Sequence, residues 1–337
     1  MKECSLVTGA AGFIGQHVCR ELLQKGHKVV AVDDLSGGFA DNVPTEALFV
    51  RGSINDAPPI NQLFQEHRFD YVFHLAAYAA EGLSHFIKTF NYTNNLLGSI
   101  NLINAAVNLG SVKCFVFTSS IAVYGRNQLP MTEEAVPQPE DPYGIAKHAV
   151  EMDLKEAHEM FGLNYVIFRP HNVYGEGQNI GDPYRNVIGI FMNHILQNKA
   201  MTLFGDGKQT RAFSYISDVA PIIAECINRS KTFNQVFNVG ADHPYSVLEL
   251  ATTVAQAMGV TPEIKFLEAR NEVLHAYSAH DKIKAHFGDL VKNVPLDEGV
   301  RRMAQWVKKV GSRKGEPFRN IEVYKNLPPS WLALSKQ

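Results

Sequence analysis

The sequence has 337 residues, of which 45% are hydrophobic and 20% charged, enough to bury one large domain or two modest ones. Its net charge of -2, without a run of basic residues, gives no reason to expect binding to nucleic acid or to an anionic membrane. No apolar run approaches the ~18 residues that cross a bilayer, no signal peptide is recognisable, and the cysteines have no paired spacing, so we expect a cytoplasmic protein without disulfides or a metal site.

The first predicted unit is a strand, a glycine-rich turn, a helix and a second strand that ends in an acidic residue. In chain order these are 4–8, Gly9, Gly12, Gly15, 17–25, 28–32 and Asp33. The glycines let the backbone turn tightly and let a pyrophosphate approach the N-terminus of the helix. A carboxylate at Asp33 can hold a ribose 2′-hydroxyl and would repel a 2′-phosphate, so this unit predicts binding of NAD rather than NADP.

Further strands are expected at 47–50 and 113–118, with a long helix at 91–108 between them. Ser120 lies just past the strand 113–118. Ligands of doubly wound sheets bind at such strand ends, and a serine hydroxyl there can hydrogen-bond a substrate alcohol or ketone.

Tyr143 and Lys147 stand at the start of a helix predicted over 146–161. They are four residues apart, so one helical turn places them on the same face. Free tyrosine titrates near 10, so a tyrosine base at pH 7 requires a pKa lowered by about 3 units, or about 4 kcal/mol. A partly buried lysine and a second cation, such as an oxidised nicotinamide ring, can supply that stabilisation. With Ser120, the pair predicts a site that removes a proton from an alcohol.

The glycine spacing G-x-x-G-x-x-G, Ser120 and the Tyr143/Lys147 pair resemble the extended branch of the short-chain dehydrogenase/reductase superfamily, in particular its NAD-dependent sugar-nucleotide epimerase/dehydratase family. The resemblance implies an α/β fold, a Rossmann-type doubly wound parallel sheet with a smaller α/β C-terminal substrate-binding domain. It also implies three roles. Tyr143 is general base and acid, Ser120 orients the sugar hydroxyl, and Lys147 holds the nicotinamide ribose while it lowers the pKa of the tyrosine.

The same resemblance implies a fourth strand at 71–77, whose end passes beneath the cofactor, and an asparagine that ties the helix 91–108 to the central strand. The implied cofactor-binding residues are Gly9, Gly12, Phe13, Ile14, Gly15, Asp33, Ser53, Ile54, Leu75, Ala76, Ala77, Asn95, Ser119, Tyr143, Lys147 and Pro170. Ser53 departs from the family, which usually has an acid there in contact with the adenine.

The second half alternates strands at 164–168, 202–204 and 235–240 with helices at 187–197, 246–258 and 297–309, and 178–186 is expected to be an irregular loop. We expect Asp218 to cap a helix and Ser246 to form a capping box with Glu249. We divide the chain into an NAD-binding domain at 1–172, to which about 210–240 returns, a substrate domain at 173–310 and a tail at 311–337 without a recognisable motif.

The resemblance also implies a set of substrate-binding residues. They are Glu81, Ser84, Ser120, Tyr143, Asn172, Asn186, Val187, Thr202, Phe204, Arg211, Arg270 and Tyr277. Asn172, Arg211 and Arg270 would hold a diphosphate, for which the planar donors of arginine are well suited. Asn186, Val187, Thr202 and Phe204 are candidates around a uracil-like ring.

Three residues bear on the choice of sugar and on the chemistry. Tyr277 falls at a gatekeeper position, where a bulky residue leaves little room for an N-acetyl group. Glu81 would face the sugar, where it could select a hydroxyl pattern or supply the acid that is missing beside Ser120, and it would repel a C6 carboxylate. The alternative is that it merely caps the helix that follows it. His171 takes a place from which it could stack or hydrogen-bond under the nicotinamide, or act in catalysis.

The residues after Ser120 separate the reactions of the family. Dehydratases and decarboxylases carry an acid within two places of this serine, and 3,5-epimerases carry a cysteine near the second place, whereas this sequence has Ile121 and Ala122. We therefore expect C4 epimerisation of a nucleotide sugar of the UDP-glucose/UDP-galactose type, through a transient 4-keto sugar with retained NAD.

The alternatives are a UDP-glucuronate 4-epimerase or another nucleotide-sugar epimerase, a ketoreductase or dehydrogenase of the same superfamily, and a non-catalytic NAD-sensing regulator. The family pairs the helices 91–108 and 146–161 across a two-fold axis as a four-helix bundle, so we also expect a homodimer.

Overall fold

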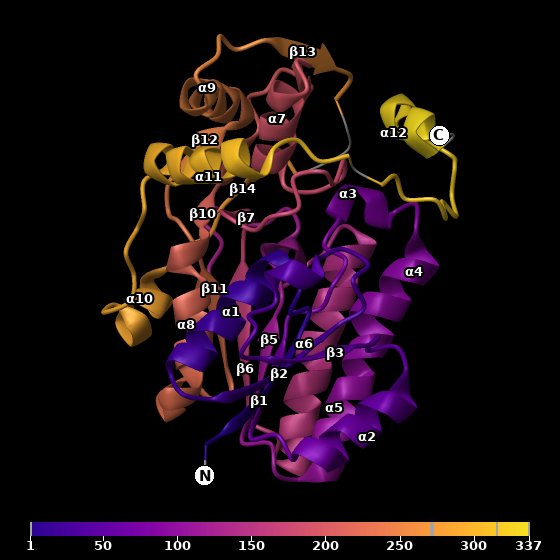
Figure 1. Cartoon of the computed structure of the whole chain (residues 1–337), viewed down its shortest axis with the longest axis vertical. Coiled ribbons are helices and arrows are strands. Elements are labelled where there is room, and N and C mark those ends of the chain that lie inside the picture. The colour runs from indigo at the N-terminus through magenta and orange to yellow at the C-terminus, as the bar shows by residue number, and fades with distance from the viewer. Residues whose placement is uncertain (1, 270–272, 315, 336–337) are drawn as a thin grey trace.

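A parallel sheet of seven strands forms the centre of the protein in a computed structural model, which describes residues 2–269, 273–314 and 316–335 (Figure 1). In order across the sheet the strands are β11 (Gln235–Val239), β6 (Tyr165–Pro170), β5 (Cys114–Thr118), β4 (Tyr71–His74), β1 (Cys4–Thr8), β2 (Lys28–Asp33) and β3 (Leu48–Arg51). All neighbouring pairs are parallel, so the carboxyl ends of the strands meet at one edge. The strand order reverses between β1 and β4, which confirms the predicted doubly wound fold and marks its ligand-binding edge.

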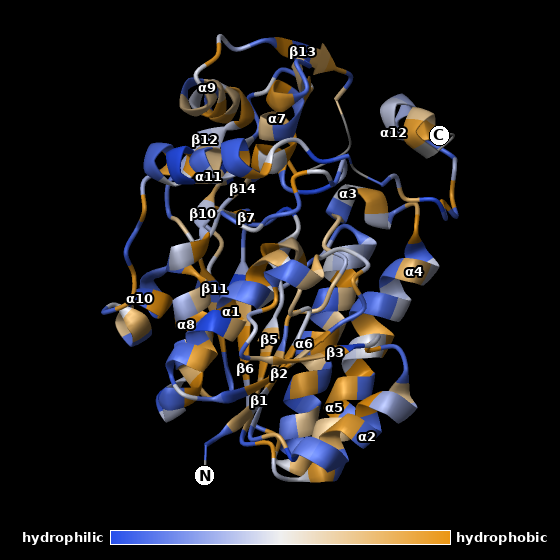
Figure 2. Cartoon of the chain, in the orientation of Figure 1, coloured by the Kyte–Doolittle hydropathy of each residue, from blue (hydrophilic) through white to orange (hydrophobic). Residues whose placement is uncertain are grey.

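Helices cover both faces of this sheet. On one face α1 (Phe13–Gln24) packs against α8 (Ala220–Glu225), and the other is covered by α2 (Ala57–His67), α5 (Gly98–Leu109) and α6 (Pro142–Phe161). Alternate strand residues supply the two cores: Val7 belongs to the first and Leu6 to the second. Because both faces are buried, the strands are almost continuously hydrophobic (Figure 2).

The remaining elements lie mostly beyond the carboxyl edge of the sheet. Helices α7 (Val187–Leu196), α9 (Val247–Met258) and α11 (Leu296–Val310) pack together there. The short strands pair as β8 (Met201–Phe204) with β13 (Ile264–Leu267), β7 (Val173–Tyr174) with β10 (Ser214–Tyr215), and β9 (Thr210–Ala212) with both β12 (Pro244–Ser246) and β14 (His275–Ala276). Short helices complete the chain: α3 (Glu81–Ser84), α4 (Lys88–Tyr92), α10 (Asp281–Phe287) and α12 (Pro329–Ser335). The division into domains stays a prediction.

Local hydrogen bonds explain which of the predicted helix caps the structure contains. The capping box of α9 is confirmed, because Ser246 Oγ accepts from the Glu249 amide at 3.1 Å and the Glu249 carboxylate accepts from the Ser246 amide at 2.7 Å. The expected cap at Asp218 is wrong: its Oδ2 accepts from the amide of Val294 at 2.8 Å, and α8 begins after Val219.

Two helices also differ from their predicted limits. The helix expected at 91–108 is interrupted by a π-helical turn at Thr93–Leu97, where the Asn94 side chain donates to the Phe90 carbonyl at 2.8 Å and so competes with the helical ladder. Helix α6 begins four residues earlier than predicted, because Asp141 caps it through the Gly144 amide at 2.9 Å and Pro142 suits its first turn. Tyr143 therefore lies inside the helix. Within the described ranges, no helix is long and apolar enough to cross a membrane.

A buried ion pair fixes α6 to the sheet below the site. Arg169 on β6 donates from Nε and Nη2 to the two carboxylate oxygens of Glu151 on α6, at 2.9 and 2.5 Å, and the Ser119 hydroxyl donates to the same carboxylate at 2.6 Å. Burial alone would raise the pKa of Glu151, but the hydrogen bonds and charge of Arg169, the nearby His148 ring and the Ser119 hydroxyl hold the pKa at about 2. Both partners are almost fully buried, so neither can be removed without leaving the other uncompensated.

We predict that Glu151→Gln lowers the free energy of unfolding at pH 7 by about 3 kcal/mol, because it leaves a buried guanidinium without its carboxylate. The pKa of Glu151 lies below its ordinary value of 4.5, so its stabilisation is present above pH 4.5 and is lost as the pH falls toward 2. Urea unfolding at several pH values should show wild type and variant converging in acid. Glu225→Gln, which removes a more exposed partner of Lys25, is the control and should cost less than about 1 kcal/mol. A Glu151→Gln difference that did not change with pH would contradict this account.

Candidate active site

A cavity of about 1590 Å³ opens at the carboxyl edge of the sheet, between the sheet and the elements beyond it. It is lined by the glycine-rich turn after β1, by the ends of β2, β4, β5 and β6, by the start of α6, and by β8 and the loop before α7. The strand ends thus bring residues far apart in the sequence into one site, as doubly wound folds do.

The glycine-rich turn has the shape of a dinucleotide cradle. Gly9 has φ +70°, and a Cβ added there would lie 2.7 Å from the Ala76 amide nitrogen, so no other residue fits without a shift of the backbone. Asp33 accepts from the Ala11 amide at 3.0 Å and the Leu35 amide at 2.8 Å, which sets its carboxylate beside the turn. Burial raises the pKa of Asp33, and the amides of Leu35 and Ala11 oppose that rise.

The residues present fit a bound dinucleotide. Gln178 and Thr118 line the cavity, and Gln178 Oε1 and Thr118 Oγ1 are buried without a hydrogen-bond partner in the described structure. The first-turn amides of α1 face the same space, and Asp33 can accept from ribose hydroxyls.

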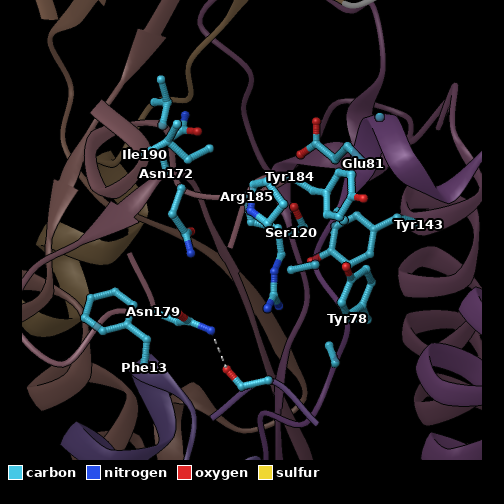
Figure 3. A pocket seen from close by; sticks show the side chains of 18 of the residues that line it. Phe13, Tyr78, Glu81, Ser120, Tyr143, Asn172, Asn179, Tyr184, Arg185 and Ile190 are labelled. Carbon is cyan, nitrogen blue, oxygen red and sulfur yellow. Dashed lines mark hydrogen bonds between the residues drawn. The ribbon is translucent and has the colours of Figure 1, made fainter. Parts of the chain in front are cut away.

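Ser120, Tyr143 and Lys147 line the same cavity, as the sequence predicts, and Figure 3 shows Ser120 and Tyr143 at its wall. Ser120 follows β5, and its Oγ accepts from the Ala122 amide at 3.1 Å, which closes a 3₁₀ turn at Ile121–Tyr124. Tyr143 is 5% exposed in the first turn of α6. Lys147 Nζ donates to the Thr118 carbonyl at 2.8 Å and lies 5.9 Å from the centre of the Tyr143 ring.

The predicted lowering of the Tyr143 pKa by Lys147 and a bound nicotinamide stays a prediction, and in the protein alone other groups dominate. Burial raises the pKa of Tyr143, the charge of Glu81 raises it further, and the Ser120 hydroxyl acts in the opposite direction. Burial also lowers the pKa of Lys147 to about 7, against the attraction of Glu151. The spacing of four residues correctly placed the lysine beside the tyrosine, and burial is the largest influence on the pKa of each group.

Most of the other predicted residues also line the cavity. The cofactor candidates that do so are Gly9, Gly12, Phe13, Ile14, Gly15, Asp33, Ile54, Leu75, Ala76, Ala77, Ser119 and Pro170, and the substrate candidates are Glu81, Asn172, Asn186, Val187, Thr202, Phe204 and Arg211. Arg211 is held by backbone carbonyls: Nη1 donates to those of Thr210 and Leu274 at 2.9 Å, and Nη2 donates to that of Val273 at 2.5 Å. Roles for individual residues stay predictions.

Three of the cofactor or substrate candidates that lie outside the cavity lining form hydrogen bonds with the backbone of nearby residues. The Ser53 hydroxyl accepts from the Asn55 amide at 3.3 Å. Asn95 accepts from the Tyr78 amide at 2.8 Å and donates to the Tyr78 carbonyl at 3.1 Å, so it holds the loop after β4. The buried Ser84 hydroxyl donates to the Glu81 carbonyl at 2.6 Å and accepts from the Tyr143 amide at 3.3 Å.

The gatekeeper position and the histidine also fall outside the lining. The backbone carbonyl of Tyr277 accepts a hydrogen bond from the Met131 amide at 3.0 Å, and Tyr277 does not line the cavity. The buried His171 ring lies within hydrogen-bonding distance of the Ala212 carbonyl, at 3.1 Å, and of His280, at 3.2 Å. Arg270 lies outside the described residues.

Three residues near Tyr143 were not predicted from the sequence. Tyr184 and Arg185 line the cavity near Tyr143 (Figure 3), and Asp182 supports Arg185. Arg185 Nε donates to Asp182 Oδ2 at 2.7 Å, and its guanidinium lies 4.6 Å from the centre of the Tyr78 ring. The sequence feature that could have identified them is an aspartate and an arginine three residues apart, in a segment predicted only to be an irregular loop.

Comparisons with known proteins agree with this geometry. The model of the NAD-dependent epimerase/dehydratase family matches residues 5–240. A putative UDP-glucose 4-epimerase of Methanocaldococcus jannaschii is 33% identical over 307 residues, 90% of this chain and 98% of that protein. The solved structure of UDP-glucose 4-epimerase from Thermotoga maritima with UDP-glucose has a TM-score of 0.85 at 34% identity, covering 91% of this chain and 99% of its own. That of Thermus thermophilus UDP-glucose 4-epimerase with NAD has a TM-score of 0.82 at 31% identity, covering 90% and 99%.

We predict that Asp33→Asn raises the affinity for NADPH relative to NADH by about tenfold or more, because it removes the repulsion of a 2′-phosphate by the carboxylate. Titration of the reduced dinucleotides, followed by their fluorescence, measures both affinities. Asp34→Asn changes the same charge at the next position, where the carboxylate accepts from the Ser36 amide, and should leave the ratio within about twofold. Equal changes in the two variants would show that Asp33 does not select the cofactor.

Proposed function

We propose that this chain, which belongs to the NAD-dependent epimerase/dehydratase family, inverts C4 of a UDP-linked hexose through a transient 4-keto sugar, with its NAD retained. The observation that carries the proposal is the environment of Ser120. The two residues after it, Ile121 and Ala122, form an apolar turn, so the position from which dehydratases and decarboxylases of the family place their acid offers no proton-transfer group here. The site can take a proton and return it to the same oxygen.

Three side chains perform the proton chemistry in this scheme. Ser120 orients the 4-hydroxyl of the sugar, and Tyr143 takes the proton of that hydroxyl as C4 becomes a ketone. Lys147, fixed by the Thr118 carbonyl, positions the cofactor ribose beside Tyr143. When bound, NAD supplies the acceptor and donor of the C4 hydride and a positive charge that favours the phenolate. Tyr143 returns the proton after the keto sugar has turned its other face.

The diphosphate anchor must hold while the hexose turns. Asn172, Arg211 and Arg270 are the proposed anchor, and Asn186, Val187, Thr202 and Phe204 the proposed surroundings of the base. Asn172 has φ +40°, and its Nδ2 donates to the Ala212 carbonyl at 3.0 Å, which places it firmly at the end of β6. A fixed anchor lets one carbon of the sugar present either face to the same reacting groups.

The charges around Tyr143 favour a neutral hexose. Glu81 lines the cavity and acts on Tyr143, so it would repel a C6 carboxylate. The guanidinium of Arg185 favours a uronic acid, but its charge is already balanced by Asp182, at 2.6 Å in the ion pair. UDP-glucose and UDP-galactose are therefore the proposed pair, and UDP-glucuronate is the second candidate.

Two alternatives predict different cofactor behaviour. A dehydrogenase or ketoreductase on this fold would release its dinucleotide in every cycle and would need it added. A non-catalytic NAD sensor would bind the dinucleotide without turnover, and its site would not require the intact set of Ser120, Tyr143 and Lys147 that this chain brings together.

We also propose a homodimer through α5 and α6. These two helices pack side by side, and large apolar side chains are exposed on them: Leu97, which precedes α5, is 54% exposed, and Ile145 and Met152 on α6 are 43% and 55% exposed. Ile145 and Met152 are seven residues apart and thus share a helical face. Pairing two copies of this surface would bury them in a four-helix bundle.

We expect the purified protein, without added NAD, to convert UDP-glucose to a C4 epimer of unchanged mass. Proton NMR of the anomeric region, with UDP-glucuronate, UDP-N-acetylglucosamine and dTDP-glucose as parallel substrates, measures conversion. Loss of water or carbon dioxide would refute the proposal, and a requirement for stoichiometric dinucleotide would favour the dehydrogenase. Tyr143→Phe should lower turnover by about 100-fold or more. Tyr165→Phe, which removes a hydroxyl outside the cavity, is the matched control.

Replacing both Leu97 and Met152 by glutamate should convert a dimer to a monomer, because four like charges would meet across the proposed interface. Size-exclusion chromatography with light scattering measures the mass. Val136→Glu, at a loop position 69% exposed, should leave the mass unchanged. A double variant that stayed dimeric would exclude this surface as the interface.

A further inference from the structure

The last part of the chain, for which the sequence predicted no structure or role, crosses the molecule to the active site. Residues 316–335, called here the C-terminal strap, leave α11 and run beside α3 and α4, where α12 lies close to α3 (Figure 1). The strap forms a hydrophobic cluster of its own with these helices and with Tyr184, separate from the two cores of the sheet.

The strap is attached first at Phe318. Its amide donates to the hydroxyl of Tyr184 at 3.2 Å, and its ring lies 4.8 Å from that of Phe90 and 5.6 Å from that of Tyr78. The Phe318–Phe90 contact is edge-to-face, an arrangement that is favourable beyond the area it buries. The strap therefore joins α4 to the loop before α7.

The second attachment is a helix cap supplied from far along the sequence. Glu322 accepts from the amides of Thr89 and Phe90, at 2.8 and 3.0 Å, in the first turn of α4. Those amides have no partner within the helix, and a carboxylate at a helix N-terminus is favoured by the helix dipole. The adjacent backbone adds bonds from the Glu322 and Val323 amides to the Phe86 carbonyl.

Trp331 makes the third attachment. It is 5% exposed, and its ring lies 5.4 Å from that of Tyr184 and 6.2 Å from that of Phe86. A Cβ added at Gly82 would lie only 3.1 Å from this ring, closer than ordinary carbon contacts, so glycine permits the approach of α3. Trp331 thus packs between two segments, one immediately after Glu81 and the other immediately before Arg185.

The strap also supplies part of the cavity wall. Its lining residues are Val323, Lys325, Asn326, Leu327, Pro328, Pro329, Ser330, Trp331 and Leu334. Because Ser120 and Tyr143 fix where the reacting carbon of a hexose would lie, Glu81 and Arg185 mark the hexose end of the cavity. The strap packs behind these two residues, whereas the glycine-rich turn and Asp33 lie at the dinucleotide end.

We propose that the C-terminal strap completes the hexose end of the site and that Trp331 is a positioning residue, which fixes Glu81 through α3 and Arg185 through Tyr184. This inference rests on the proposed function only in taking a nucleotide-linked hexose as the ligand. It makes the affinity for the sugar, and not that for the nucleotide or the dinucleotide, depend on a side chain at the C-terminal end of the chain.

The test compares Trp331→Ala, Trp331→Phe and Tyr324→Ala, each in a Tyr143→Phe background that silences turnover. Tyr324 is the matched control, because it is an aromatic residue of the strap that is 60% exposed and does not line the cavity. Calorimetric titration with UDP-glucose and with UDP measures both affinities, and thermal unfolding with NAD checks that each variant is folded.

Trp331→Ala should weaken the binding of UDP-glucose by about tenfold or more and the binding of UDP by less than about twofold. Trp331→Phe should recover most of the lost affinity for UDP-glucose. Tyr324→Ala should change neither affinity. Equal weakening of UDP and UDP-glucose, or no weakening of either, would overturn the inference. The proposed function is judged separately by turnover of the wild type: a protein that binds UDP-glucose without epimerising it would refute that function, while the strap is still tested by binding.

If Trp331→Ala does not fold, a second measurement tests the proposed role of the strap. The chain has two tryptophans, so Trp306→Phe leaves Trp331 as the only fluorophore of its kind. The emission of Trp331 should change on addition of UDP-glucose to the NAD-loaded protein and should change far less with UDP. An unchanged emission, or an equal response to both ligands, would contradict contact between the strap and the hexose end.

Discussion

The hydrogen bond from the Lys147 ammonium to the Thr118 carbonyl, 2.8 Å long and fully buried, is the contact on which the site depends. It fixes the first turns of α6 against the end of β5. Helix α6 can come so close because residue 144 is glycine, where a Cβ would lie 2.5 Å from the Ala122 carbonyl oxygen. The same register places Tyr143 one turn before the lysine, above the turn that carries Ser120. A longer side chain at 144 would push the helix away and separate the three groups.

Beneath this hydrogen bond, the buried ion pair of Glu151 and Arg169 supports it. Glu151 lies one turn after Lys147 on α6, bonds to Arg169 and Ser119, and attracts the ammonium of Lys147. Removing an ammonium from water is costly unless partners replace the lost hydration, and here a carbonyl and a nearby carboxylate do so in part. The site is thus rigid because its charged groups satisfy one another, and a rigid supporting shell is what holds reacting groups in a productive geometry.

The sequence was sufficient where the signal is local. Runs of β-branched residues located the strands, the glycines with Asp33 located the turn after β1, and a spacing of four residues placed Tyr143 and Lys147 side by side in the cavity. The sequence was insufficient where a side chain bonds to a residue far away in the sequence, or where burial sets its pKa. The pKa of Tyr143 depends on burial and on Glu81, which no spacing predicts. Ser84, expected to touch the substrate, lies outside the cavity lining and accepts from the Tyr143 amide. Asn95 holds the Tyr78 backbone, in agreement with the expected tie between its helix and the central strand.

The C-terminal strap extends this argument from electrostatics to water exclusion. An epimerase of the proposed kind forms a ketone that must neither leave nor react before it is reduced, so its hexose must be shielded from solvent. Closing the hexose end with a segment from the end of the chain has a physical cost, because ordering that backbone opposes folding. The three attachments at Phe318, Glu322 and Trp331 offset that cost through aromatic contacts and capped helix amides. Each attachment joins residues more than 130 positions apart, so the strap depends on a fold that brings α3, α4 and Tyr184 together.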